Sequence, residues 1–448
     1  MTLSAVVFVI VASIVVGAIV GLMPGLPAAL GLLLMLPMLA VFPPEVAVLF
    51  FCCYICVTQY FGSVSALLFK IPGEGSSLPA LAVAQQLRQT SSIIKAYRVT
   101  AFTSFVASMF AIALLVGIYF LFESYWPYLF SIKFIVAWLT ILLILLLLQG
   151  GKYLFNISML MLGLGISYAN EIPALNNLCT WSQTVCFLRT APDMNLILLS
   201  LFCIPVLFYR LPKNSQTIGK SSYMPGWRTA FPFWRKGIWH GLVGFITGFT
   251  PGAGLTLASN ISHSIERRRH PSRLLTAIGS AEASNNAAAI SCAIPFLFLA
   301  LPITPSEIVL ENYLTSHFFR WEINRLEQVV VFAQFSISFF SLLIGSLVVT
   351  NIVCLLASGS GINLYHRFLQ HNLGKIMLMA RALIMVSLIM LIWFNNTAWN
   401  TAVFYMLFFG AIGVWAQHSG KDIVGLALTI VLGRFIIEKH SMFVHLYF

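Results

Sequence analysis

Long stretches of the chain contain no Asp, Glu, Lys or Arg, and this feature limits the fold more than any other. A membrane-spanning helix needs about 20 apolar residues. The chain is 59% hydrophobic and 8% charged, whereas a soluble domain carries about 25% charged residues. Since the apolar runs are continuous rather than alternating, they predict helices and not strands. The charge-free stretches are 3–44, 46–69, 99–122, 134–151, 153–170, 194–209, 237–265, 283–306, 328–366, 382–420 and 423–433.

We therefore predict an all-α polytopic membrane protein with roughly 10–12 transmembrane segments in a lipid bilayer. The net charge of +12 does not indicate a nucleic-acid partner here, because basic loops in membrane proteins set topology through the positive-inside rule. Basic residues cluster at 210–236 and at Arg267–Arg273. We place both clusters on the cytoplasmic side. The stretch 237–265 between them then leaves and re-enters on one side, as a hairpin of two short helices.

One motif occurs twice in the chain. Gly-x-x-x-Gly-x-x-Pro-Gly is found at Gly17–Gly25 and again at Gly244–Gly252, with an offset of 227. A second pair follows in the same order, because Leu67–Pro72 resembles Leu297–Pro302 at an offset of 230. Chance matching between apolar segments is the alternative, but two matches at nearly one offset favour an internal repeat.

The repeat predicts two related transmembrane halves, 1–209 and 237–448, joined by a basic cytoplasmic linker at 210–236. Helices that break at corresponding positions of two halves are typical of secondary transporters, where the breaks build the binding site. We expect the halves to be inverted repeats, since transporter folds with such hairpins often are.

The Pro-Gly breaks are predicted to hold a coupling ion. Such a pair ends a helix and frees backbone carbonyls, and unwound carbonyls coordinate Na⁺ or H⁺ in transporters. We expect Na⁺ or H⁺ as coupling ion, with Na⁺ at the helix tips, and no other cofactor. A simple tight turn is the alternative. The predicted residues are Pro24, Gly25, Pro251, Gly252 and Gly254.

A second break, near residue 72, is predicted to bind a small anionic substrate. A helix that starts after Pro72-Gly73 would direct its free N–H groups and positive end at an anion. Two alternatives remain, because Ser76 and Ser77 are also typical N-cap residues and Lys70 could pair with Glu74. The predicted substrate-binding residues are Gly62, Ser63, Lys70, Pro72, Gly73 and Ser76.

The segment Ser280–Ala287 is the most polar part of an otherwise apolar region. Two adjacent asparagines inside a membrane segment are costly unless they are hydrogen-bonded, and an amide can bind both a cation and a carboxylate. We predict substrate binding by Ser284, Asn285 and Asn286, with Pro302 at the following break, and coupling-ion binding by Glu282. The alternative places Glu282 in the first turn of a helix, where it would complement the helix dipole.

No motif nominates an enzyme. The sequence has no Walker A loop, no H-E-x-x-H and no G-x-S-x-G, and these motifs mark the commonest nucleotide, metal and serine chemistries. The alternative to a transporter is a membrane-embedded protein that handles a lipid or isoprenoid phosphate near Lys70. Cys179 and Cys186 could form a disulfide if their loop faces an oxidising compartment.

At these clusters the chain resembles the large membrane subunit of the tripartite tricarboxylate transporters, the TctA-type family. The resemblance implies a permease in the bacterial inner membrane that carries small carboxylates by symport with Na⁺ or H⁺. It also implies two partners, a small TctB-like membrane subunit and a periplasmic TctC-like solute-binding protein. The matching stretches are Gly21–Gly25, Tyr60–Ser63 with Ile71–Gly73, Pro251–Gly254, Ala281–Ala287, and Ile294-Pro295 with Leu301-Pro302.

The chain departs from the family pattern at four positions, Pro27, Phe61, Lys70 and Ile303. Lys70 stands where the family usually has Asn. We hypothesise that this added cation favours a more negative substrate or replaces the coupling cation.

Overall fold

The computed structural model is helical throughout the part of the chain that it describes. Described residues are 3–23, 28–39, 41–69, 75–87, 90–129, 132–148, 153–168, 194–208, 227–252, 254–299, 301–317, 337–360, single positions between 374 and 389, 399–419 and 423–447. No strand occurs among them, which confirms the predicted all-α fold.

The described helices lie before and after the start of the predicted linker at 210–236. The first half begins with α1 (Leu3–Leu22), α2 (Ala28–Leu39), α3 (Pro44–Phe69), η1 (Gly75–Ser77), α4 (Leu78–Gln86) and α5 (Thr90–Leu129). The second begins with α10 (Trp234–Thr247), α11 (Gly254–Arg269), α12 (Leu274–Ser291), α13 (Ala293–Leu299), α14 (Pro305–His317) and α15 (Ile337–Ser360). The boundary predicted at 209 lies outside the described residues, so the extent of the halves stays a prediction.

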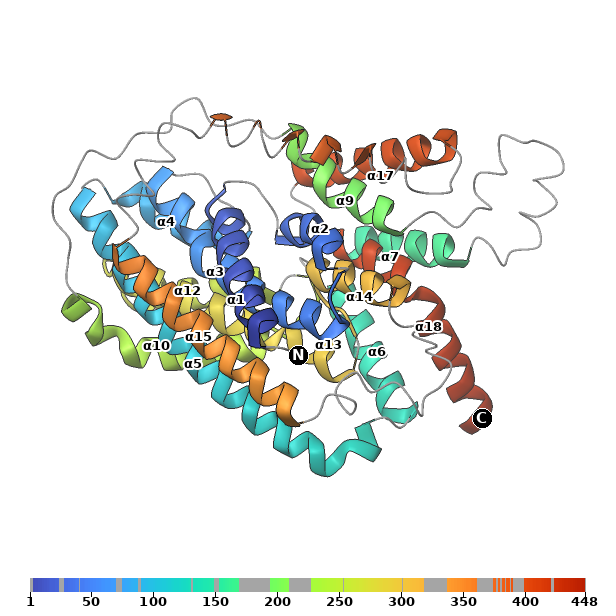
Figure 1. The fold of residues 1–448 in the computed structure, drawn as a ribbon, viewed down its shortest axis with the longest axis horizontal. Coiled ribbons are helices and arrows are strands. Elements are labelled where there is room, and N and C mark those ends of the chain that lie inside the picture. The colour runs from blue at the N-terminus through green and yellow to red at the C-terminus, as the bar shows by residue number, and fades with distance from the viewer. Residues whose placement is uncertain are drawn as a thin grey trace.

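Five further α-helices belong to the described fold, and Figure 1 shows them away from α10 and α12. Helix α17 packs against α9, and α18 packs against α7 and α6. Their bounds are α6 (Ile132–Leu148), α7 (Tyr153–Tyr168), α9 (Met194–Phe208), α17 (Trp399–Ser419) and α18 (Val424–Tyr447).

The glycines of the repeated motif bring two pairs of helices into close backbone contact. A Cβ added at Gly21 of α1 would lie 2.5 Å from the carbonyl oxygen of Thr58 in α3. A Cβ added at Gly248, which caps α10, would lie 2.8 Å from the carbonyl oxygen of Ala288 in α12. Only a residue without a side chain fits there, as in close helix packing generally. The partners Thr58 and Ala288 are themselves 230 positions apart, so both halves use the same contact.

Four described helices contain segments long and apolar enough to cross a membrane. The segment Pro44–Leu67 of α3 is almost fully buried, whereas Ser4–Leu22 and Ser92–Leu121 each bury only a third of their residues. Exposed apolar surface on a long helix of this kind is expected to contact lipid rather than water. The protein is therefore a membrane protein, with α3 as a central helix and α1 and α5 nearer to the lipid.

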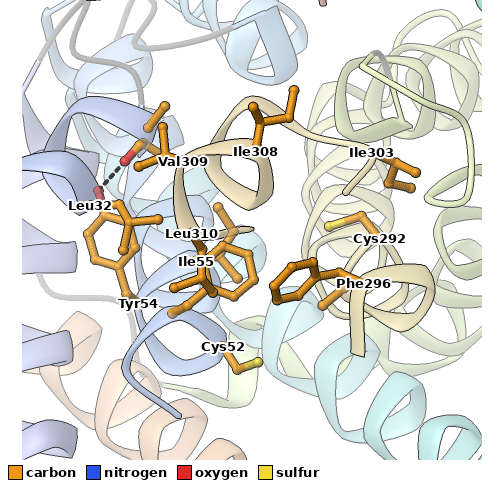
Figure 2. Close-up of a cluster of buried hydrophobic side chains, with 14 of the residues drawn as sticks. Leu32, Cys52, Tyr54, Ile55, Cys292, Phe296, Ile303, Ile308, Val309 and Leu310 are labelled. Carbon is orange, nitrogen blue, oxygen red and sulfur yellow. Dashed lines mark hydrogen bonds between the residues drawn. The ribbon is translucent and has the colours of Figure 1, made fainter. Parts of the chain in front are cut away.

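The two halves share one hydrophobic core. Figure 2 shows Cys52, Tyr54 and Ile55 of α3 in the same buried cluster as Phe296 of α13 and Leu310 of α14. Phe51 and Phe296 form an edge-to-face ring pair with centroids 6.1 Å apart. Helix α5 packs along α12, and α15 packs against both α3 and α5 (Figure 1). The second half therefore packs closely against the first, and α12 contacts helices of both halves.

Candidate functional site

Helix α12 carries polar side chains inside the molecule. All of its residues from Ala277 to Ser291 are buried, and the chain surrounds it with α3, α5, α10 and α11. A buried carboxylate or amide is costly unless it is paired, so the contacts of each polar group decide its role. The polar side chains between Ser280 and Asn286 are at most 2% exposed; they are Ser280, Glu282, Ser284, Asn285 and Asn286.

These side chains reach three neighbouring helices. Ser284 Oγ donates to the carbonyl oxygen of Ala258 in α11 at 3.0 Å. Asn286 Nδ2 donates to Ser104 Oγ of α5 at 2.9 Å and to the Glu282 carbonyl at 3.0 Å. The Glu282 carboxylate has hydrogen-bonding contacts with Ser63 of α3 and with Asn285. We call the group Ser63, Ser104, Ser280, Glu282, Ser284, Asn285 and Asn286 the α12 cluster.

Several oxygens of the α12 cluster have no hydrogen-bond partner among the described residues. They are Ser280 Oγ, Glu282 Oε1, Asn285 Oδ1 and Asn286 Oδ1. In the described part of the chain no Lys, Arg or His pairs with Glu282, since the ion pairs there involve Glu266. Hard oxygen ligands of net negative charge suit a hard cation. The residues of the cluster therefore fit a bound cation such as Na⁺.

The two breaks of the second half touch each other. The Pro251-Gly252 break separates α10 from α11, as the sequence predicts. Gly252 has a φ of 70°, a left-handed conformation that favours glycine. Its N–H donates to the carbonyl oxygen of Ile303 at 2.8 Å, next to Pro302. A hydrogen bond between two irregular segments therefore joins the hairpin tip to the break before α14.

Glu307 holds the second of these breaks in shape. Its Oε2 accepts the N–H groups of Ile303 at 2.6 Å and Thr304 at 3.0 Å, while Thr304 Oγ1 accepts the Glu307 N–H at 3.3 Å. This reciprocal arrangement is a capping box with an additional amide. Glu307 is fully buried, so its carboxylate satisfies backbone donors that water cannot reach.

Comparison with known proteins supports the resemblance seen in the sequence. Residues 7–427 match the model of the family described as "Tripartite tricarboxylate transporter TctA family". The chain belongs to the TctA family. The match extends over both sets of breaks and the α12 cluster, so the expected resemblance is confirmed.

A curated relative is the "Uncharacterized 52.8 kDa protein in TAR-I ttuC' 3'region" of Agrobacterium vitis. It is 26% identical over 310 residues, which cover 65% of this chain and 60% of the relative. The matched region therefore spans less than two thirds of that protein. No solved structure matches the chain.

Within this TctA family chain, the predicted residues of the second half gather around α12. Glu282, Asn285, Asn286 and Ser284 belong to the α12 cluster, as described above. The first-turn interpretation of Glu282 is wrong: α12 begins at Leu274, so Glu282 lies about two turns inside the helix. The break residues Pro251, Gly252 and Pro302 lie at the junction of the hairpin tip with α14, and Gly254 begins α11.

The first half contributes fewer of the predicted residues. Ser63 is buried against Glu282, whereas Gly62 is only half-buried in α3. Ser76 donates to Gln59 Oε1 of α3 at 3.2 Å. The N-cap alternative is confirmed in position for Ser77, which is the N-cap of α4 although its side chain makes no capping bond, and it is wrong for Ser76. Pro24, Gly25, Lys70, Pro72 and Gly73 lie outside the described residues, as do Cys179 and Cys186.

The sequence interpretation missed two contributors, Glu307 and Ser104. Glu307 was detectable, because Thr304-Pro305-Ser306-Glu307 is a capping-box sequence with proline at the first helical position. Ser104 had no signal, since it is one of several hydroxyl residues in an apolar helix. Only the packing of α5 against α12 gives it a role.

Proposed function

We propose that the chain is the large permease subunit of a tripartite tricarboxylate transporter, and that it moves a small di- or tricarboxylate by symport with Na⁺ or H⁺. The observation that carries this proposal is the α12 cluster. Several of its buried side-chain oxygens have no hydrogen-bond partner among the described residues, and helix α12 is contacted by helices of both halves. A core that only needed stability would use apolar residues at these positions, because unpaired buried polar groups are costly.

The coupling cation binds at Glu282, Asn285 and Asn286. The Glu282 carboxylate supplies the charge, and the Asn285 and Asn286 oxygens supply neutral ligands. Ser104 and the Glu282 carbonyl orient the Asn286 amide, so that its oxygen stays available. Binding is useful for transport only if it differs between two states of the protein, and the touching breaks at Gly252 and Ile303 provide a joint that could take two arrangements.

The substrate carboxylates bind beside the cation. Ser63 and Ser284 lie there, but the Ser284 hydroxyl donates to the Ala258 carbonyl and Ser63 contacts Glu282. The predicted residues 70–76 would therefore supply the donors, as a helix N-terminus and the Lys70 cation. Because the substrate is an anion and the ion is a cation, each neutralises part of the other's charge in the buried site. This mutual neutralisation is a physical reason for symport.

The proposal includes the partners and location that the family implies. A TctC-like periplasmic protein delivers the substrate, a TctB-like small subunit completes the membrane complex, and the bacterial inner membrane is the location. The test is uptake of radiolabelled di- and tricarboxylates by vesicles that contain this chain with its candidate partners, under an imposed Na⁺ or H⁺ gradient. Accumulation with one gradient supports the proposal and identifies the ion. No accumulation with any carboxylate, by a complex shown to be assembled, contradicts it.

Variants at Glu282 test the residue assignment. Glu282→Gln keeps the shape and removes the charge, so we expect gradient-driven uptake to fall at least about tenfold, the equivalent of about 1.4 kcal/mol. Asn351→Ala is the control, because Asn351 is an equally buried asparagine whose amide, among the described residues, donates within its own helix α15, to the Leu347 carbonyl at 2.8 Å. Unchanged uptake and ion dependence in Glu282→Gln would remove the α12 cluster from the mechanism.

A further inference from the structure

A pocket of about 650 Å³ lies on the side of the helix bundle where α4, α5, η6 (Phe231–Phe233), α10 and α12 come together. It is separate from the α12 cluster, because α12 contributes only its first residues, Leu274 to Thr276, to the pocket wall. Its size is that of an ordinary small-ligand site. The transport proposal gives this pocket no role.

The charged residues of the pocket wall are cations. Lys95 comes from α5, Lys236 from α10 and Arg273 from the turn before α12, and no Asp or Glu is among the described residues that line the pocket. The hydroxyl groups of Ser92, Ser272 and Thr276 also line it and can donate hydrogen bonds.

Among the described residues, the carboxylate that pairs with a residue of the pocket wall is that of Glu266, and it does not cancel the charge of the pocket. Glu266 Oε1 is 2.5 Å from Lys236 Nζ and 3.0 Å from His240 Nε2, so its charge is compensated by Lys236. Lys95 and the Arg273 guanidinium have no side-chain partner among the described residues. The pocket therefore keeps two uncompensated positive charges, and this charge selects an anion.

The surroundings of the pocket match a membrane boundary. The apolar span of α5 starts at Ser92, in the pocket wall. Large aromatic side chains nearby are unusually exposed, namely Phe231 at 63%, Trp234 at 40% and Trp239 at 52%. Tryptophan is enriched at the level of lipid headgroups, and Lys and Arg are enriched at the cytoplasmic face. The pocket is thus at the depth where phosphates of the bilayer lie.

We propose that this pocket binds a phosphate-bearing anion, with Lys95 and Arg273 as its main ligands and Lys236 at its edge. The aromatic belt favours the headgroup of an anionic membrane lipid as the source of that phosphate. Basic pockets between transmembrane helices on the cytoplasmic side bind such headgroups. Five structural elements meet at the pocket, so a bound headgroup would hold the α4–α5 connection, the hairpin α10 and the start of α12 together. The site is independent of the transported substrate and of the coupling ion.

The test is a binding titration of the purified full chain in neutral detergent, read by native mass spectrometry. The probes are phosphatidylglycerol, which is anionic, phosphatidylcholine, which carries a phosphate but no net charge, and inorganic phosphate. We expect phosphatidylglycerol to bind more tightly than phosphatidylcholine. Each of Lys95→Gln and Arg273→Gln should weaken its binding about fivefold, the effect of one cation near an anionic membrane surface.

Arg268→Gln is the matched control, because Arg268 is an exposed residue of the same basic segment that does not line the pocket. The double variant combines Lys95→Gln and Arg273→Gln. Displacement of the lipid by inorganic phosphate from wild type, but not from this variant, would support the site and show that it recognises the phosphate group itself. Equal weakening by Arg268→Gln and Arg273→Gln would overturn the proposal in favour of diffuse attraction. Equal binding of phosphatidylglycerol and phosphatidylcholine would overturn it as well.

Discussion

The contact between α10 and α12 leads to a sharp prediction at Gly244. A Cβ at this position would lie 2.7 Å from the Cα of Ser284 and closer still to the Ser284 carbonyl oxygen. Ordinary Cβ contacts begin near 3.4 Å, and the obstructing atoms are backbone that cannot rotate away. The Ser284 carbonyl oxygen would lie well under 3.0 Å from the added Cβ, and real Cβ contacts that short essentially never occur. Gly244→Ala must therefore separate the two helices by about 1 Å, at a residue of the α12 cluster.

Gly345→Ala is the matched control for this change. Gly345 lies within α15, and nothing would lie within 4 Å of a Cβ there. Both substitutions gain the same helix propensity, about 0.5–1 kcal/mol, so the difference between the two variants isolates the cost of overpacking. That cost is about 1–3 kcal/mol.

The assay compares thermal unfolding of the two variants in one detergent, followed by gradient-driven uptake. We expect Gly345→Ala to unfold at or slightly above the wild-type temperature and to transport normally. Gly244→Ala should unfold at a lower temperature and lose uptake several-fold, because Asn285 and Asn286 move with Ser284. If both variants unfold together and transport like wild type, close packing of α10 on α12 does not position the cluster.

Two further predictions concern buried carboxylates. Glu307→Ala leaves two buried backbone amides at the break before α14 without an acceptor, which should cost about 1–3 kcal/mol of stability for each. Glu307→Gln keeps an acceptor oxygen and should lose less stability. Equal thermal unfolding temperatures of the two variants would contradict the capping role. Glu266 lies near the end of α11, outside the charge-free stretch 237–265. Burial acts to raise the pKa of its carboxyl group, but hydrogen bonds from Lys236 and His240 outweigh the effect of burial and lower that pKa. A lowered pKa stabilises the folded state above the unfolded pKa of about 4.3, and this contribution is lost as the pH falls through the folded value. The advantage of wild type over Glu266→Gln in thermal unfolding should therefore be full at pH 7 and shrink as the pH falls below the unfolded pKa of about 4.3. An advantage that stays constant as the pH falls below that value would contradict the ion pair.

The sequence by itself determined the class of the protein and the positions of its described breaks. Continuous apolar runs favour helices in a bilayer, and Pro251-Gly252 favours a helix break because proline and glycine act through the local backbone. The repeated glycines indicated an internal repeat, and the helix contacts that they make in the structure have partners, Thr58 and Ala288, at nearly the same offset as the glycines.

The contacts of the site were decided only by the tertiary structure. Glu282 meets Ser63, and Asn286 meets Ser104, across 219 and 182 positions of sequence. No local pattern encodes such pairs. In a soluble helix the apolar stripe would at least show which face is buried, but a membrane helix is apolar towards lipid and towards protein alike. Which side of α12 faces α3 and which faces α5 is therefore set by the close fit of glycines and small side chains between helices.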